Sequence, residues 1–181
     1  MPGDLVAVQG VGGLGLLGVQ FASKFGYRVA AIGRGAENGV LAKKLGARVY
    51  IDSNATNAAE GLQKLGGAQV ILAIAPNSKA MSELIDGLGP SGKLMVVGAM
   101  FDPIEVSPIQ LINGSRSIQG WSSGTAADSE DTLRFAELPP PDIGRIGVVD
   151  DTVLENEGAH ARTFAHERDA QRRPSLGRSP Y

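Results

Sequence analysis

A glycine-rich turn close to the amino end constrains the fold of this chain more than any other feature. Residues 9–18 read QGVGGLGLLG, in which Gly10, Gly12 and Gly15 follow the spacing G-x-G-x-x-G. The turn comes directly after a short apolar run, LVAVQ (5–9), and before a segment whose apolar residues have helical spacing. A strand, a glycine turn and a helix in this order predict the opening unit of a parallel α/β sheet.

Short apolar runs and helical segments continue to alternate up to residue 138. Predicted strands span 5–9, 28–32, 48–52, 69–75, 93–99 and 117–121. Several are nearly continuous in apolar residues, as in strands covered on both faces. Predicted helices run from the glycine turn to Phe25, around Val40–Leu45, and over 54–65, 78–88 and 128–138. This alternation predicts a doubly wound parallel α/β sheet of about six strands, a Rossmann fold, with helices on both faces.

The apolar spacing also predicts which face of the first helix is buried. Leu17, Phe21 and Phe25 recur every four residues, and Leu14 and Val19 widen the same face. The fourth predicted helix ends before GPSG (89–92), and the fifth strand follows that segment.

The composition changes after residue 138. Residues 139–181 hold six of the eleven arginines, both histidines and half of the ten prolines, but no lysine. We therefore divide the chain into a Rossmann domain (1–138) and a C-terminal tail (139–181). Two interpretations of the tail stay open: a disordered extension, or an end read out of frame, since GC-rich DNA in a shifted frame tends to encode arginine.

The bulk composition excludes several classes of protein. Of the 181 residues, 43% are hydrophobic and 20% are charged, as in soluble globular proteins. The net charge of −2 gives no reason to expect nucleic acid or an anionic membrane as a partner. No apolar run reaches the roughly 18 residues of a membrane span, and no signal peptide is recognisable, so we expect a cytoplasmic protein. The absence of cysteine excludes disulfides and thiolate metal sites.

The glycine turn has the features of a dinucleotide-binding loop. Gly10 permits the tight turn, Gly12 lets the backbone approach a pyrophosphate, and Gly15 lets the helix pack closely on the strand. The free N–H groups at the start of the helix would face the phosphates. The alternative is a strand–helix turn that requires glycine only for its own geometry.

The acidic residue that usually binds the adenosine ribose is missing. Such an acid stands about 20 residues beyond the glycine loop, at the end of the second strand, where this chain has Gly33-Arg34-Gly35. An arginine beside a glycine would admit a 2′-phosphate and pair with it. We therefore expect NADP as the preferred cofactor, with NAD as the alternative. The alternative is that Arg34 is a solvated loop residue.

Three stretches together resemble the cofactor domain of the medium-chain, zinc-type alcohol dehydrogenases. They are the glycine loop, GRGAENGVLAKKLGARVYIDS (33–53) and GKLMVVGA (92–99). The resemblance covers residues 3–138. It implies the strand order 3-2-1-4-5-6 and a cofactor at the carboxyl ends of the strands.

The resemblance also implies roles for individual positions. The pyrophosphate would be held by Gly12, Gly13, Leu14 and Gly15, and the adenosine ribose would face Gly33 and Arg34. The nicotinamide side would be lined by Ala75, Pro76, Val97, Gly98 and Ala99. Ser122, Ser123 and Gly124 follow the sixth strand and would reach the same region. Glu37 and Asn38 stand where the family often carries a basic residue, which opposes the NADP assignment.

The resemblance implies parts that this chain lacks. In the family, a preceding barrel-like domain supplies the zinc ligands and the proton relay, whereas this chain starts at MPGDLVAVQG. A catalytic zinc needs three protein ligands, and residues 1–138 offer no matching set. We therefore expect no zinc site and a chain truncated at both ends.

These observations predict the NAD(P)-binding domain of an alcohol dehydrogenase-like oxidoreductase that does not transfer hydride on its own. A fragment of a zinc-free quinone reductase stays open, because such enzymes share this cofactor domain. So does a non-catalytic nucleotide-binding module, since family members commonly dimerise through the sixth strand, here SIQGW (117–121) with Trp121. A methyltransferase that binds S-adenosylmethionine also has a glycine loop, but Gly33-Arg34 argues against it.

Overall fold

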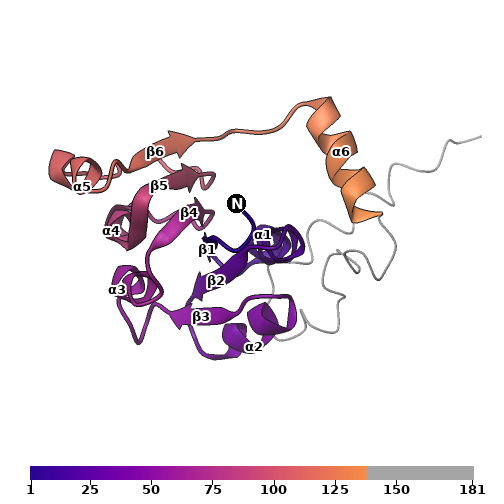
Figure 1. Ribbon diagram of the computed structural model, residues 1–181, viewed down its shortest axis with the longest axis horizontal. Helices are drawn as coiled ribbons and strands as arrows, with labels where there is room; N and C mark the ends of the chain where they lie inside the picture. Colours follow the sequence, from indigo (N-terminus) through magenta and orange to yellow (C-terminus); the bar gives the residue numbers. More distant parts are fainter. Residues whose placement is uncertain (138–181) are drawn as a thin grey trace, which may run out of the picture. The chain divides into compact units, whose positions relative to one another are not determined.

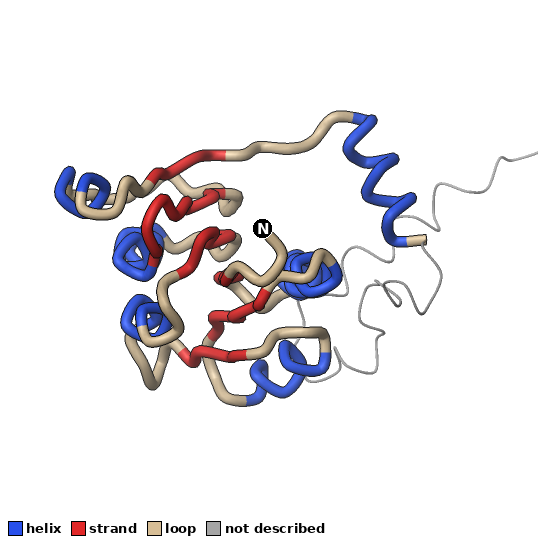
Figure 2. Tube along the Cα trace, in the orientation of Figure 1, coloured by secondary structure: helices blue, strands red, loops and turns tan. Residues whose placement is uncertain are grey.

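Six strands and six α-helices alternate along the part of the chain that the computed structural model describes, residues 1–137 (Figures 1 and 2). The strands are β1 (Leu5–Gln9), β2 (Arg28–Gly33), β3 (Val49–Asp52), β4 (Ala68–Ala73), β5 (Leu88–Val96) and β6 (Ser117–Gly120). The helices are α1 (Gly13–Lys24), α2 (Glu37–Lys44), α3 (Ala58–Gln63), α4 (Ser78–Leu84), α5 (Pro108–Ile112) and α6 (Ala126–Ala136). The predicted domain boundary at 138 and the tail lie outside the described residues.

The strands form one parallel sheet in the order β3-β2-β1-β4-β5-β6. The doubly wound fold and the strand order are therefore confirmed. The order reverses between β1 and β4, and a doubly wound sheet has its ligand crevice at such a point, beyond the carboxyl ends of the strands. None of the described helices is long and apolar enough to cross a membrane.

Two apolar clusters attach helices to the two faces of the sheet. On one face, Val19 of α1 and Ala42 of α2 belong to the same buried cluster as Val8 of β1. On the other face, Leu62 of α3 and Met81 of α4 belong to the second cluster. Figure 1 shows these two pairs of helices on opposite sides of the strands.

The buried face of α1 matches only part of the one that the apolar spacing predicts: Val19 is buried as expected, but the ends of the predicted stripe are not. Leu14 is 56% exposed and Phe25 is 51% exposed. The residues that are buried are Gly15, Leu16, Val19 and Gln20. The reason is close packing, because a Cβ at Gly15 would overlap the Gly10 carbonyl and lie 2.9 Å from its carbon. A glycine-faced helix approaches its strand more closely than a stripe of bulky residues would allow.

The aromatic residues of that stripe contact α6 instead. The ring of Phe135 lies 5.9 Å from the ring of Phe21 and 4.5 Å from that of Phe25, centroid to centroid. Such distances are typical of favourable aromatic pairs. The last described helix is thus attached to the first one.

Helices α3 and α4 are shorter than the apolar spacing predicts. Helix α4 stops at Leu84, a single 3-10 turn follows at Ile85–Gly87, and β5 already begins at Leu88. The register of β5 against β4 shifts between residues 88 and 93, so residues 89–92 form an irregular part of the strand. Helix α5 was not predicted, although Pro108 opens it and the Gln110 side chain accepts a hydrogen bond from the Ser107 N–H at 2.9 Å.

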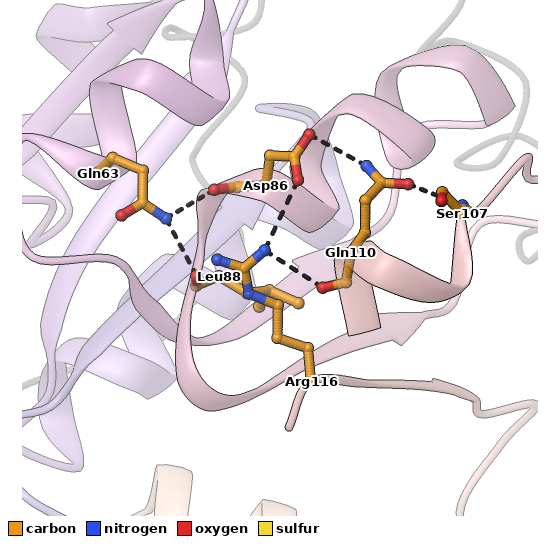
Figure 3. Close-up of polar contacts among 6 residues, drawn as sticks. All are labelled: Gln63, Asp86, Leu88, Ser107, Gln110 and Arg116. Atoms are coloured by element: carbon orange, nitrogen blue, oxygen red, sulfur yellow. Dashed lines mark hydrogen bonds and ion pairs between the residues drawn. The ribbon is translucent and has the colours of Figure 1, made fainter. Parts of the chain in front are cut away.

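A polar network fixes α5 and β6 to the rest of the domain (Figure 3). Arg116, just before β6, donates from Nη1 to the Gln110 carbonyl at 3.3 Å and lies 3.6 Å from the Asp86 carboxylate. The Gln110 amide donates to the other Asp86 oxygen at 3.0 Å. From α3, the Gln63 amide donates to the carbonyls of Asp86 and Leu88 at 2.6 and 3.0 Å. Three segments distant in sequence are therefore joined beside the edge strand.

Candidate functional site

The glycine loop joins β1 to α1 at the carboxyl edge of the sheet. Gly10 has a φ of +104°, in the region that favours glycine, and a Cβ there would lie 3.0 Å from the Ala75 nitrogen. Gly15 approaches the Gly10 carbonyl too closely for any side chain. These two glycines are therefore required by the packing of the loop itself.

Gly12 and Gly13 differ from them, because a Cβ at either position would meet no atom within 4 Å. Gly12 is the N-cap of α1, no side chain caps the helix, and its first turn carries no acidic residue. No side chain of the described residues therefore caps the N–H groups of the first turn. A helix N-terminus in this condition favours an anion, because its dipole and its free N–H groups both attract negative charge. Leu14 is exposed beside them.

The loop after β2 is held by groups from the end of β3. The Gly35 N–H donates to the Asp52 carboxylate at 3.0 Å, and the Tyr50 hydroxyl donates to the Gly35 carbonyl at 2.7 Å. The Ser53 hydroxyl donates to the Gly33 carbonyl at 3.0 Å. Gly33 and Arg34 thus lie in a fixed loop at the edge of the crevice. Sequence reasoning missed these supports, although an acid that ends a strand, as Asp52 does, was an available signal.

Two carboxylates and one guanidinium surround this loop. Arg34 is exposed, and its carbonyl accepts a hydrogen bond from the Asn38 amide at 2.9 Å. The Glu37 carboxyl lies so close to Gly35 that a Cβ there would be 2.6 Å from its Cδ. Burial raises the pKa of Tyr50, and the negative charges of Asp52 and Glu37 raise it further. The loop therefore carries an exposed guanidinium at Arg34, and the carboxyl groups of Asp52 and Glu37 lie close to Gly35.

The loops after β4 and β5 meet beside the glycine loop. The N–H groups of Val97 and Gly98 both donate to the Ala73 carbonyl at 3.0 Å. A Cβ at Gly98 would lie 3.0 Å from the Ile74 carbonyl carbon. The structure thus brings the regions of Ala75 and Gly98 together at one edge, next to Gly10. Pro76 and Ala99 are exposed in the same loops.

The residues predicted after β6 lie further along the chain. The Trp121 N–H donates to the Val96 carbonyl at 2.9 Å and so continues the β5–β6 pairing. Ser122, Ser123 and Gly124 are exposed between β6 and α6. Their predicted position on the nicotinamide side stays a prediction.

Residues 1–137 offer few side chains that could bind a metal ion together. Within residues 1–137, no group of three or more His, Cys, Asp or Glu side chains could hold a metal ion. The whole sequence contains no cysteine. The described residues therefore do not fit a catalytic zinc, which needs three protein ligands.

Comparison with known proteins gives consistent matches. The profile of a family described as zinc-binding dehydrogenase matches residues 13–137. Alcohol dehydrogenase patD of Penicillium expansum is 47% identical over 137 residues, which are 76% of this chain and 40% of that protein.

Two solved structures extend the comparison. The alcohol dehydrogenase of the archaeon Aeropyrum pernix matches with a TM-score of 0.69 and 26% identity, over 75% of this chain and 40% of that one. The quinone oxidoreductase of Thermus thermophilus, also solved with NADPH, matches with a TM-score of 0.64 and 28% identity, over 74% of this chain and 44% of that one. The chain thus spans less than half the length of each of these proteins.

Proposed function

Because the chain belongs to the family of zinc-type alcohol dehydrogenases, as its NAD(P)-binding domain, we propose that residues 1–137 bind a nicotinamide dinucleotide. The pyrophosphate would lie on Gly12, Gly13, Leu14 and Gly15 at the start of α1. The adenosine ribose would face Gly33 and Arg34, and the nicotinamide would lie against Ala75, Pro76, Val97, Gly98 and Ala99.

One observation carries this proposal: the open surface over Gly12 and Gly13 at the uncapped start of α1. Both positions lack a side chain without any need from the neighbouring protein atoms. A ligand that approaches the backbone there explains their identity, since a Cβ would occupy the ligand's place. When bound, the dinucleotide supplies the hydride acceptor or donor, and the residues described here hold and orient it.

Isothermal titration calorimetry of the full chain with NAD and with NADP tests the proposal. We expect saturable binding of about one dinucleotide per chain, because the crevice occurs once in a sheet of this order. The absence of binding by both dinucleotides, from protein whose circular dichroism spectrum is that of an α/β fold, would refute it.

The charges around the Gly33–Gly35 loop support a finer proposal about the adenosine ribose. Arg34 would pair with the 2′-phosphate of NADP, while Glu37 would repel it. Arg34→Ala should therefore weaken NADP binding about fivefold and leave NAD binding nearly unchanged. Glu37→Gln should strengthen NADP binding about threefold. Titration of both variants with both cofactors measures these ratios.

Arg48→Ala is the matched control for the loss of charge, because Arg48 is exposed and lies directly before β3, at the amino end of that strand. It should change neither affinity by more than about twofold. Equal effects of Arg34→Ala on NAD and NADP would show that Arg34 is a solvated residue and would end the argument for NADP.

For the isolated chain we propose cofactor binding without hydride transfer. Hydride transfer also needs a polarised substrate and a proton acceptor, and the described donor set does not fit the family's zinc. A fragment of a zinc-free quinone reductase is the second candidate, supported by the likeness to the Thermus thermophilus quinone oxidoreductase. Alcohol-dependent formation of NADH or NADPH by the purified chain would contradict cofactor binding alone, and quinone-dependent oxidation of NADPH would favour the second candidate.

We also propose that two copies pair through β6. Among the described strands, β6 is one of the two edges of the sheet, and edge strands present unpaired backbone groups. Trp121, directly after β6, is 54% exposed. We therefore expect a dimer by light scattering, with a blue shift of tryptophan emission as the protein is concentrated. A monomer at every concentration would contradict this pairing.

A further inference from the structure

Gly33, the last residue of β2, stands where a dinucleotide-binding fold usually has the acid that binds the adenosine ribose. Its backbone does not require glycine, because its φ, unlike that of Gly35 at +83°, is not positive. A side chain is excluded by lack of space instead. A Cβ at position 33 would lie 2.8 Å from the Tyr50 hydroxyl oxygen, 3.2 Å from Cε2 of the same ring and 2.9 Å from Cγ2 of Val11. Non-bonded carbon atoms pack best at about 3.5–4.0 Å, so position 33 is closed to any side chain.

Of the two side chains that close position 33, that of Tyr50 is the less able to move. Its hydroxyl donates a hydrogen bond to the Gly35 carbonyl at 2.7 Å. Its rigid ring also packs against α2, where a Cβ at Gly39 would lie 2.7 Å from Cδ1. Val11 presents only the methyl group of a short side chain, which can rotate about χ1. Tyr50 is therefore the group that keeps position 33 without a side chain.

The pairing of β2 with β3 brings Tyr50 to this place. Tyr50 pairs with Ala31, and side chains alternate along a strand, so position 33 faces the same side of the sheet as Ala31. Ala31, Val11 and Tyr50 all belong to the cluster under α1 and α2. A side chain at position 33 would therefore begin on a covered face and would have to pass Tyr50 to reach the crevice. The charged group that the loop does expose is Arg34.

We infer that Tyr50 is a specificity-determining residue for the adenosine ribose, because it occupies the space that an NAD-selecting acid at position 33 would need. This inference rests on the proposed function. Without an acid at position 33, no carboxylate there repels a 2′-phosphate, and the loop that Tyr50 holds through Gly35 presents Arg34 to that phosphate. Tyr50 needs no contact with the cofactor for this role, since it acts through the space that it denies to residue 33.

Gly33→Ala tests the closed space without a change of charge. In the wild-type background, the added Cβ should lower the urea midpoint by about 1 M. In the Tyr50→Val background, the same change should lower the midpoint by less than about 0.3 M relative to Tyr50→Val alone, because the nearest remaining atom is the rotatable methyl group of Val11. Tyr50→Phe removes only the hydroxyl and should relieve part of the loss, so the comparison can also be made with the ring retained.

Gly33→Asp tests the selectivity, measured by calorimetry with NAD and NADP. In the Tyr50→Val background, the carboxylate has room to accept a hydrogen bond from the ribose 2′-hydroxyl and to repel a 2′-phosphate. The ratio of the NADP Kd to the NAD Kd should therefore rise at least about tenfold. In the wild-type background, the new side chain should displace the loop and weaken both cofactors, so the ratio should change by less than about threefold. A purely structural role of Tyr50 would give the same change of ratio in both backgrounds.

Gly120→Ala is the matched control for the stability measurement. Gly120 ends β6, and a Cβ there meets no atom within 4 Å. Its effect on the urea midpoint should be the same whether residue 50 is tyrosine or valine. Since neither midpoint comparison involves the cofactor, the steric step of the inference is tested separately from binding.

The outcomes distinguish this inference from the proposed function. Failure of the wild-type protein to bind both NAD and NADP would overturn both. If the wild type binds, and Gly33→Asp alone changes the ratio as strongly as it does together with Tyr50→Val, the proposed function stands and Tyr50 does not set the specificity. Equal losses of midpoint on Gly33→Ala in both backgrounds would show that Tyr50 does not close position 33 and would overturn the inference as well.

Discussion

Alanine at position 15 should lower the free energy of unfolding by about 3 kcal/mol. A Cβ at Gly15 would overlap the Gly10 carbonyl, and backbone cannot move aside as the end of a flexible side chain can. Helix α1 would therefore have to shift away from β1, at the centre of the sheet. Urea denaturation followed by circular dichroism measures the loss as a lower midpoint.

Gly13→Ala is the control for this prediction. Gly13 begins the same helix, and a Cβ there meets no protein atom within 4 Å. Its stability should equal or slightly exceed that of the wild type, because alanine favours a helix by up to about 1 kcal/mol over glycine. Equal midpoints for Gly15→Ala and wild type would show that the helix does not pack on the strand in this way.

Gly12→Ala, unlike Gly15→Ala, should change the stability little and weaken dinucleotide binding strongly. The φ of Gly12 is −116° and a Cβ there has open space, so the change should cost at most about 1 kcal/mol of stability. A Cβ would nevertheless stand where the pyrophosphate approaches the backbone. We expect the Kd for the preferred dinucleotide to rise at least about tenfold, measured by calorimetry.

A comparable glycine away from the glycine loop tests whether the effect is local. Gly120 ends β6, and a Cβ there also meets nothing within 4 Å. Gly120→Ala should leave both the urea midpoint and the Kd unchanged. Unaltered affinity in Gly12→Ala would mean that the pyrophosphate does not lie on this loop.

The sheet was predictable because each of its strands is a short apolar run bounded by turn residues, as LVAVQ (5–9) is. The buried face of α1 was predictable only in part, through Val19. Hydrophobic spacing favours burial of the stripe through Leu14 and Phe25. The short distance between α1 and β1 instead requires a glycine at the contact, so the face that contains Gly15 is buried. Helix α5 escaped prediction because its five residues are too few to establish a helical period.

The candidate site was predicted unevenly for a related reason. The glycine loop is local in sequence, so its spacing is visible without any knowledge of the strand pairing. The supports of the Gly33–Gly35 loop, Tyr50 and Asp52, come from the neighbouring strand and become visible only once β2 and β3 are paired.

The strand order has a mechanical consequence. Strands β1 to β3 pair among themselves, as do β4 to β6, and in the described sheet the β1–β4 ladder alone joins the two halves. The proposed dinucleotide would lie across that seam, with adenosine on the first half and nicotinamide on the second. A ligand that binds only the folded form stabilises that form. The cofactor would therefore hold the two halves of the sheet together, and its removal would lower the free energy of unfolding.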